Sequence, residues 1–212
     1  MGELSKNTWE GQEKKVTMTG SELVTAEYKF VVSRNLIKGL YYLNNLLEIL
    51  LPHHIPHIRQ AGANKYIADF VPHDERHEKL QSNLDTEIGL SVEEDVEKDV
   101  RIKELNAELL ELGIYGDNKS GRNYIIDPSG KAEYVDAILP WQIIKVFNKS
   151  SSNQTSYGLD LNVDFNKLSE KVSGLPDPSL KQKAASFLSR LNQLWEEESQ
   201  KQDLSEYLHK IN

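Results

Sequence analysis

The 212-residue sequence contains no cysteine, and this absence excludes several kinds of chemistry. Disulfide bonds, thiolate metal sites and a cysteine nucleophile all need a residue that the chain does not have. The composition also fits a reducing compartment, so we expect a cytoplasmic protein. A Gly-x-Ser-x-Gly segment is absent as well, which removes the commonest sequence signature of a serine hydrolase.

Long apolar runs are also missing. The longest, residues 46–51, is interrupted by Glu48 and is far shorter than the roughly 20 residues that span a bilayer. Residues 1–6 lack the basic and apolar regions of a signal peptide, and Lys6 stands where a myristoylation signal has Ser or Thr. We therefore expect a protein without a membrane anchor.

Positive charge is in deficit, with 25 Lys and Arg against 33 Asp and Glu and a formal net charge of −8. Because basic side chains supply the sequence-independent affinity for phosphate backbones, DNA and RNA are poor candidates for a partner. Apolar residues make up 38% of the chain and charged residues 27%. This composition and length predict one folded domain or two closely packed lobes.

The sequence predicts a polar, frayed tail at residues 1–12 and then a small β-rich lobe at residues 13–73. Segments 15–19 and 23–32 are rich in β-branched and aromatic residues, which favour strands. Gly20 lies in the Thr-Gly-Ser turn between them, so the two segments predict a hairpin.

A helix and a second hairpin are predicted in the rest of this lobe. Residues 55–58 and 65–71 read as two strands with a turn around Gly62. Before them, leucines recur in steps of four and three, and Pro52 follows the last one, which predicts an amphipathic helix. These leucines are Leu36, Leu40, Leu43, Leu47 and Leu50.

Residues 74–212 predict a mainly helical lobe. Ser91 and Glu94 have the spacing of a capping box, so a long helix is predicted to start there and to end at Gly113. Asp164 and Pro178 predict the starts of two later helices, and residues 203–209 a short third. The predicted apolar faces are Ile102, Leu105, Leu109 and Leu112 on the first helix and Leu180, Ala184, Phe187, Leu191 and Leu194 on the Pro178 helix.

A third hairpin is predicted inside this lobe. Residues 124–126 and 132–135 are separated by Asp127-Pro128-Ser129-Gly130, in which proline presets φ and glycine accepts a left-handed conformation. Residues 148–157 are rich in Ser and Asn and read as a polar loop, and we expect only helices beyond it.

The resulting order of elements is hairpin, helix, two strands, helix, loop, hairpin and helices. With this order, the run Leu112-Gly113-Ile114-Tyr115-Gly116-Asp117, followed by Asn123 and a strand, resembles the catalytic loop of small-molecule and bacterial kinases. Val135-Asp136-Ala137 stands where that family has its metal-binding aspartate. The chain thus resembles a shortened, aminoglycoside-phosphotransferase-like member of the protein-kinase-like fold. The resemblance implies a two-lobed α+β domain, with a small antiparallel sheet plus one helix and a mainly helical C-terminal lobe.

This resemblance implies a site for ATP and Mg²⁺. Asp117 would orient or deprotonate an attacking hydroxyl, and Lys119 would lie near the transferred phosphate. Asn123 and Asp136 would hold Mg²⁺, a hard cation that prefers oxygen ligands. Lys29 would be the strand lysine that pairs with the phosphates.

The chain also departs from the family pattern. Tyr115 replaces the catalytic His, no Gly-rich phosphate loop precedes the turn at Gly20, and the helix after Lys29 has no convincing glutamate partner for it. Two functions stay open on this evidence: ATP/Mg-dependent phosphoryl transfer, and a catalytically inactive, pseudokinase-like binding or scaffold protein. A third is an interaction protein that docks a partner through helix 178–199, with Trp195.

Each candidate residue also has a structural interpretation. Asp127 and Asp136 flank a hairpin, where acidic residues are ordinary turn features.

The histidines form a second group of candidates for chemistry. His73 and His77 are four apart, a spacing that binds zinc on some helices, but the sequence lacks His-Glu-x-x-His and a solvated polar surface is favoured. The other clustered histidines are His53, His54 and His57.

Overall fold

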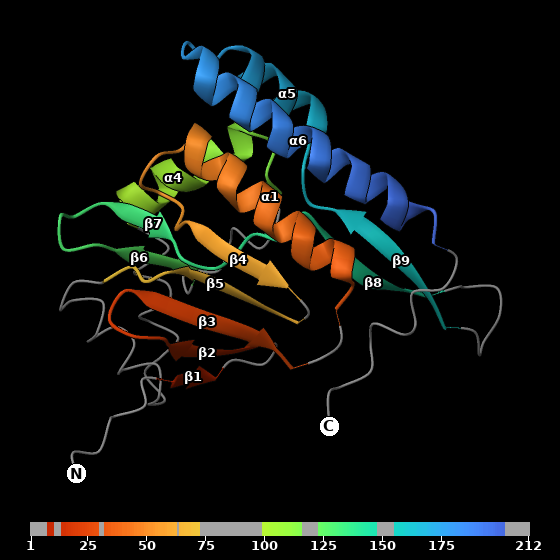
Figure 1. Ribbon diagram of the computed structural model, residues 1–212, viewed down its shortest axis with the longest axis horizontal. Coiled ribbons are helices and arrows are strands. Elements are labelled where there is room, and N and C mark those ends of the chain that lie inside the picture. Colours follow the sequence, from red (N-terminus) through yellow and green to blue (C-terminus); the bar gives the residue numbers. More distant parts are fainter. Residues whose placement is uncertain are drawn as a thin grey trace.

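The chain has an α+β fold in which helices pack against small antiparallel sheets (Figure 1). This confirms the class predicted from the sequence. The computed structural model describes residues 8–10, 14–29, 32–62, 64–72, 99–115, 123–147 and 155–201.

A five-stranded antiparallel sheet forms the first part of the fold, in the order β1-β2-β3-β5-β4. In its register Ala26 pairs with Val16 on one side and with Tyr66 on the other. Two of its hairpins were predicted, although the second begins at Ile58 rather than at residue 55. The strands are β1 (Thr8–Glu10), β2 (Lys14–Met18), β3 (Leu23–Tyr28), β4 (Ile58–Gly62) and β5 (Lys65–Asp69). Strand β1 lies in the region where the sequence predicted a frayed tail.

Helix α1 (Arg34–Leu50) lies between the sheet and the C-terminal helices (Figure 1). Ser33 caps it, since its side chain accepts a hydrogen bond from the backbone amide of Asn35. The predicted leucine stripe turns inward, and Leu40, Leu43 and Leu47 are fully buried. This helix is the predicted one, and it forms the centre of the fold.

Helix α4 (Val100–Glu111) begins later than predicted. Asp99 has extended backbone angles and is its N-cap, accepting a hydrogen bond from the amide of Arg101 at 2.9 Å. The prediction that this helix starts at Ser91 is therefore wrong, and residues 91–98 lie outside the described part of the chain. Its predicted end is confirmed, because Gly113 follows with φ of +81°.

Strands β6 (Tyr124–Ile126) and β7 (Ala132–Tyr134) form the predicted third hairpin. Gly130 has φ of +87°, and its amide donates to the carbonyl of Asp127 at 2.9 Å. The turn therefore forms by the chemistry that its residues predicted.

A further hairpin was not predicted. Strands β8 (Trp141–Phe147) and β9 (Thr155–Leu161) pair over seven residues, and β9 begins inside the segment read as a polar loop. The expectation of only helices beyond residues 148–157 is thus wrong, because β9 continues to Leu161. The described residues of this part contain four strands beside the helices. Helices α5 (Phe165–Ser173) and α6 (Pro178–Ser199) follow the predicted caps, and residues 203–209 lie outside the described part.

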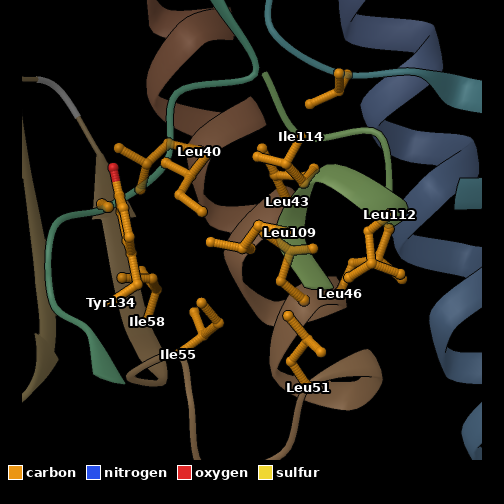
Figure 2. Packing of buried hydrophobic residues seen from close by; sticks show 14 of the residues in the cluster. Leu40, Leu43, Leu46, Leu51, Ile55, Ile58, Leu109, Leu112, Ile114 and Tyr134 are labelled. Atoms are coloured by element: carbon orange, nitrogen blue, oxygen red, sulfur yellow. The ribbon is translucent and has the colours of Figure 1, made fainter. Parts of the chain in front are cut away.

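The buried apolar side chains form a single core cluster that extends from the sheet through α1 to α4, α5 and α6. Figure 2 shows side chains of α1, α4 and β7 converging, with Leu43, Leu109 and Tyr134 among them. No helix within the described residues is long and apolar enough to span a membrane.

Candidate functional site

The β6–β7 hairpin brings two of the predicted site residues together at its open end. Tyr124 pairs with Tyr134, and the amide of Val135 donates to the carbonyl of Asn123 at 2.8 Å. Asn123 and Asp136 therefore lie at the same end of the hairpin, with Val135 as the residue that bonds Asn123. The side-chain amide of Asn123 also donates to the Tyr134 hydroxyl at 3.3 Å, and Asp136 is half-buried.

The segment after Asp136 is fixed between α1 and the sheet. Ile138 donates its amide to Asn44 Oδ1 at 3.0 Å, and its carbonyl accepts from Asn44 Nδ2 at 2.9 Å. On the other side, the amide of Ala137 hydrogen-bonds the hydroxyl of Tyr66. Burial raises the pKa of Tyr66, and this hydrogen bond opposes the rise. The hydroxyl therefore stays neutral and buried beside the segment.

Lys29 is the first residue after β3. Asn64, in the β4–β5 turn, holds this exit: Tyr28 donates its amide to the Asn64 carbonyl at 2.9 Å, and Val32 donates to Asn64 Oδ1 at 3.3 Å. The rings of Tyr28 and Tyr66 lie 6.4 Å apart between centroids. Tyr66 thus contacts both Tyr28 at the end of β3 and, through its hydroxyl, the segment at Ala137.

The predicted catalytic residues Asp117 and Lys119 lie outside the described residues. Tyr115, which stands where the kinase family has its catalytic His, is 51% exposed. Its amide donates to the carbonyl of Asn162 at 2.7 Å, and Lys167 Nζ lies 5.8 Å from its ring centroid. The structure therefore places the predicted metal residues at the same end of one hairpin, whereas the predicted catalytic residues lie outside its described part.

Glu48 is the only acidic residue of α1, and it bonds a histidine. Its Oε2 lies 2.7 Å from His57 Nδ1. His54 uses its Nδ1 in a 2.7 Å hydrogen bond with the carbonyl of Ala132 in β7. His57 thus links α1 to the segment before β4, and His54 links the segment after α1 to β7. Among the described residues, which do not include His73 and His77, no group of three or more His, Asp or Glu side chains could hold a metal ion.

Two carboxylates of the β6–β7 hairpin have pKa values shifted in opposite directions. Burial alone would raise the pKa of Asp127, but hydrogen bonds from the Ser129 hydroxyl and from backbone amides of the turn outweigh it and lower the pKa. Burial raises the pKa of Glu133 to about 7, and the nearby charge of Asp127 adds to the rise while Lys131 opposes it. Both side chains are half-buried.

Sequence reasoning missed the two asparagines that position this region. Asn44 and Asn45 are 1% and 2% exposed, and Asn45 bonds the backbone of Ile58 through both its oxygen and its nitrogen, at 3.1 and 3.0 Å. Asn is disfavoured inside helices because its side chain competes for backbone hydrogen bonds. Two consecutive Asn within a leucine-rich helix were therefore the available signal.

The predicted docking face of the C-terminal helices is occupied within the fold. Ala184, Leu191 and Leu194 of α6 are buried, and the rings of Trp195 and Trp141 lie 5.6 Å apart between centroids. Phe187 packs against the two tyrosines of α1, with centroid distances of 6.4 and 6.2 Å. A partner of α6 would have to contact its outward, polar face.

The chemistry that this region can offer depends on oxygen ligands and one amine. Asn123 and Asp136 carry the oxygen atoms that a hard cation prefers, and Lys29 carries a point charge of the kind that binds phosphate.

No protein-family model and no curated protein sequence matches this chain.

Proposed function

We propose that this chain is a kinase-like binding module that acts through a protein partner in the cytoplasm and does not transfer phosphoryl groups. The order of its elements supports the kinase-like part, since a hairpin, a helix and two strands precede a helix and the β6–β7 hairpin. The observation that carries the inactive part is the engagement of Glu48 with His57 at 2.7 Å. In protein kinases the strand lysine needs a glutamate from the helix that follows it, and α1 has no other acid.

The connection between β1 and β2 also favours a module without phosphoryl transfer. It consists of three residues, Gly11, Gln12 and Glu13. A phosphate-binding loop brings several backbone amides close to the ligand, which needs several glycines. The sequence between β1 and β2 contains one glycine, Gly11, and the charge of Glu13 would repel phosphate.

A second candidate function is ATP/Mg-dependent phosphoryl transfer, favoured by the hairpin base. The bond between Val135 and Asn123 holds the backbone of Asn123 beside the residue that precedes Asp136. The side chains of these two residues suit Mg²⁺, with a carboxylate and an amide oxygen as ligands. Lys29 would then bind the phosphates of ATP, and Asp117 and Lys119 would serve the hydroxyl and the transferred group.

Thermal unfolding with ATP separates the two candidates. A ligand that binds only the native state raises the unfolding midpoint by mass action. For an inactive module we expect no magnesium-dependent rise at millimolar ATP, with the Asp136→Asn variant behaving as the wild type. A rise that requires magnesium and disappears in Asp136→Asn would overturn the proposal and support a working phosphotransferase site.

The partner contact can be tested on the outward face of α6. Arg190 and Gln193 lie there, and their side chains are exposed and bond each other at 3.3 Å. Charge reversal by Arg190→Glu should weaken capture of a co-purifying protein without changing the unfolding midpoint. Capture of the same proteins by the wild type and by Arg190→Glu would contradict the contact, and so would an exclusively monomeric chain with no co-purifying protein.

A further inference from the structure

Asn44 makes three hydrogen bonds inside the core, and two of them join it to a segment 94 residues later in the chain. Its Nδ2 donates to the carbonyls of Leu40 and Ile138 at 2.8 and 2.9 Å, while its Oδ1 accepts from the amide of Ile138 at 3.0 Å. The orientation of the carboxamide is fixed by these partners, because a flipped amide would place both groups against atoms of the same polarity.

The neighbouring Asn45 repeats this arrangement on another segment. It pairs with the amide and the carbonyl of Ile58 at the start of β4. Consecutive residues point about 100° apart around a helix, so Asn44 and Asn45 reach two different backbones from one turn of α1. In each case the N–H and C=O groups of the side-chain amide bond the backbone C=O and N–H of one residue, as a neighbouring strand would. Leaving such buried polar groups without hydrogen bonds costs free energy.

We infer that Asn44 is a latch that holds the segment of residues 136–138 in one fixed position against α1, whether or not any ligand is bound. Ala137 is anchored from the opposite side by Tyr66, and Ile138 is 3% exposed. Movement of the segment would leave both polar groups of Ile138 and the Oδ1 of Asn44 without these partners in the core. The latch is a property of these contacts and holds independently of the kinase-like assignment.

The latch makes a clear prediction for hydrogen exchange of the Ile138 amide. This amide donates its hydrogen bond to the side chain of Asn44, whereas the amide of Leu43 lies within α1. If the latch stays closed until the protein unfolds, exchange should give the same free energy of opening for Ile138 and for Leu43. This free energy should also depend in the same way on low concentrations of denaturant. Exchange of Ile138 by a faster, denaturant-independent opening in the wild-type protein would overturn the inference.

Two matched variants then separate the latch from general packing. In Asn44→Leu, which has a similar volume and no hydrogen bonds, Ile138 should exchange on the order of 10- to 100-fold faster relative to Leu43. In Asn45→Leu the same increase should appear at Ile58, with Ile138 unchanged. Equal protection of Ile138 in all three proteins would contradict the latch, and the wild-type comparison decides the question if Asn44→Leu does not fold.

Discussion

Glu133 retains its proton in the folded protein over a range of pH in which an ordinary glutamate has lost it. Its pKa is raised from 4.5 to about 7, first by burial and then by the charge of Asp127. Between these two values the unfolded chain has released a proton that the folded chain still binds. Stability conferred by the protonated form is therefore complete below the lower value and is lost as the pH rises through the upper one.

Replacement of Glu133 by Gln should remove this pH dependence. We expect the unfolding midpoint of the wild-type protein to fall between about pH 5 and pH 8, and that of Glu133→Gln to fall less, because the amide cannot ionise. Circular dichroism melts across this range measure the difference. Asp127→Asn should also reduce the fall, because the charge of Asp127 contributes to the raised pKa of Glu133. The lowered pKa of Asp127 itself confines the loss of its own stabilisation to acid pH. Parallel curves for wild type and Glu133→Gln would contradict the assignment.

Gly39 shows how a helical glycine can stabilise a fold. An alanine in the interior of a helix is normally more stable than glycine by about 0.5–1 kcal/mol. A Cβ atom on Gly39, however, would lie 2.9 Å from Pro140 Cγ and 2.9 Å from the Trp141 ring. Trp141 is fully buried, so neither neighbour has room to move.

Gly39→Ala should therefore destabilise the protein, by about 1–3 kcal/mol for an overpacked core. Chemical denaturation gives the free energy, and the fluorescence of Trp141 should change with it. The matched control is Gly62→Ala in β4, where a Cβ atom would meet nothing within 4 Å. A stabilised Gly39→Ala protein would show that the contact with Trp141 is looser than described.

Among the elements, those with local sequence signals were predicted and those that depend on distant contacts were not. The leucine stripe and following proline predicted α1, and the turn chemistry of Asp127 and Gly130 predicted the β6–β7 hairpin. That hairpin register in turn places Asn123 and Asp136 at the same end of the hairpin. The candidate site could therefore be predicted as far as this pair, because only local rules are involved.

The β8–β9 hairpin and the role of Asn44 could not be predicted in the same way. Strand β9 contains Gly158 and begins with Thr and Ser, so its composition resembles a loop. Its pairing is stabilised at the base by Trp141, which packs on Trp195 from α6. For Asn44, the helix pattern predicts an inward position but not a partner 94 residues away.

The start of α4 at Asp99 can be tested as an element boundary. The Asp99 carboxylate accepts from the amide of Arg101 and pairs with its guanidinium, at 2.9 and 2.6 Å. Asp99→Ala should cost about 1 kcal/mol in the free energy of unfolding, the usual value of an N-cap. Asp99→Asn should cost less, because Asn also caps helices.

The same pair gives α4 a dependence on acid pH. The side-chain hydrogen bond with Arg101 holds the pKa of Asp99 below its usual value of 3.8. Its stabilisation is therefore present above that value and is lost as the pH falls through the folded pKa. The capping test at neutral pH uses urea denaturation. Equal stability of Asp99→Ala and Asp99→Asn would show that Asp99 does not cap α4 and that the helix starts elsewhere.

For the whole molecule, the continuous core predicts a single cooperative unit. The buried cluster includes side chains of the sheet, α1, α4, α5 and α6, so no part can lose its packing without exposing the next. Heat or urea should give one transition, with coincident curves from backbone circular dichroism and tryptophan fluorescence. Two separated transitions would instead indicate two lobes that fold independently, which the resemblance to a two-lobed kinase-like domain would allow.

Helix α1 must also satisfy three partners in register along its length. Gly39 faces Trp141, Asn44 faces Ile138, and Asn45 faces Ile58. One inserted or deleted residue between Gly39 and Asn44 would rotate everything beyond it by about 100°, and both carboxamides would lose their backbones together. Homologous chains should therefore vary in length at the turns and keep this stretch of α1 free of gaps, which makes the spacing from glycine to the asparagine pair a better guide to relatives than any charged residue.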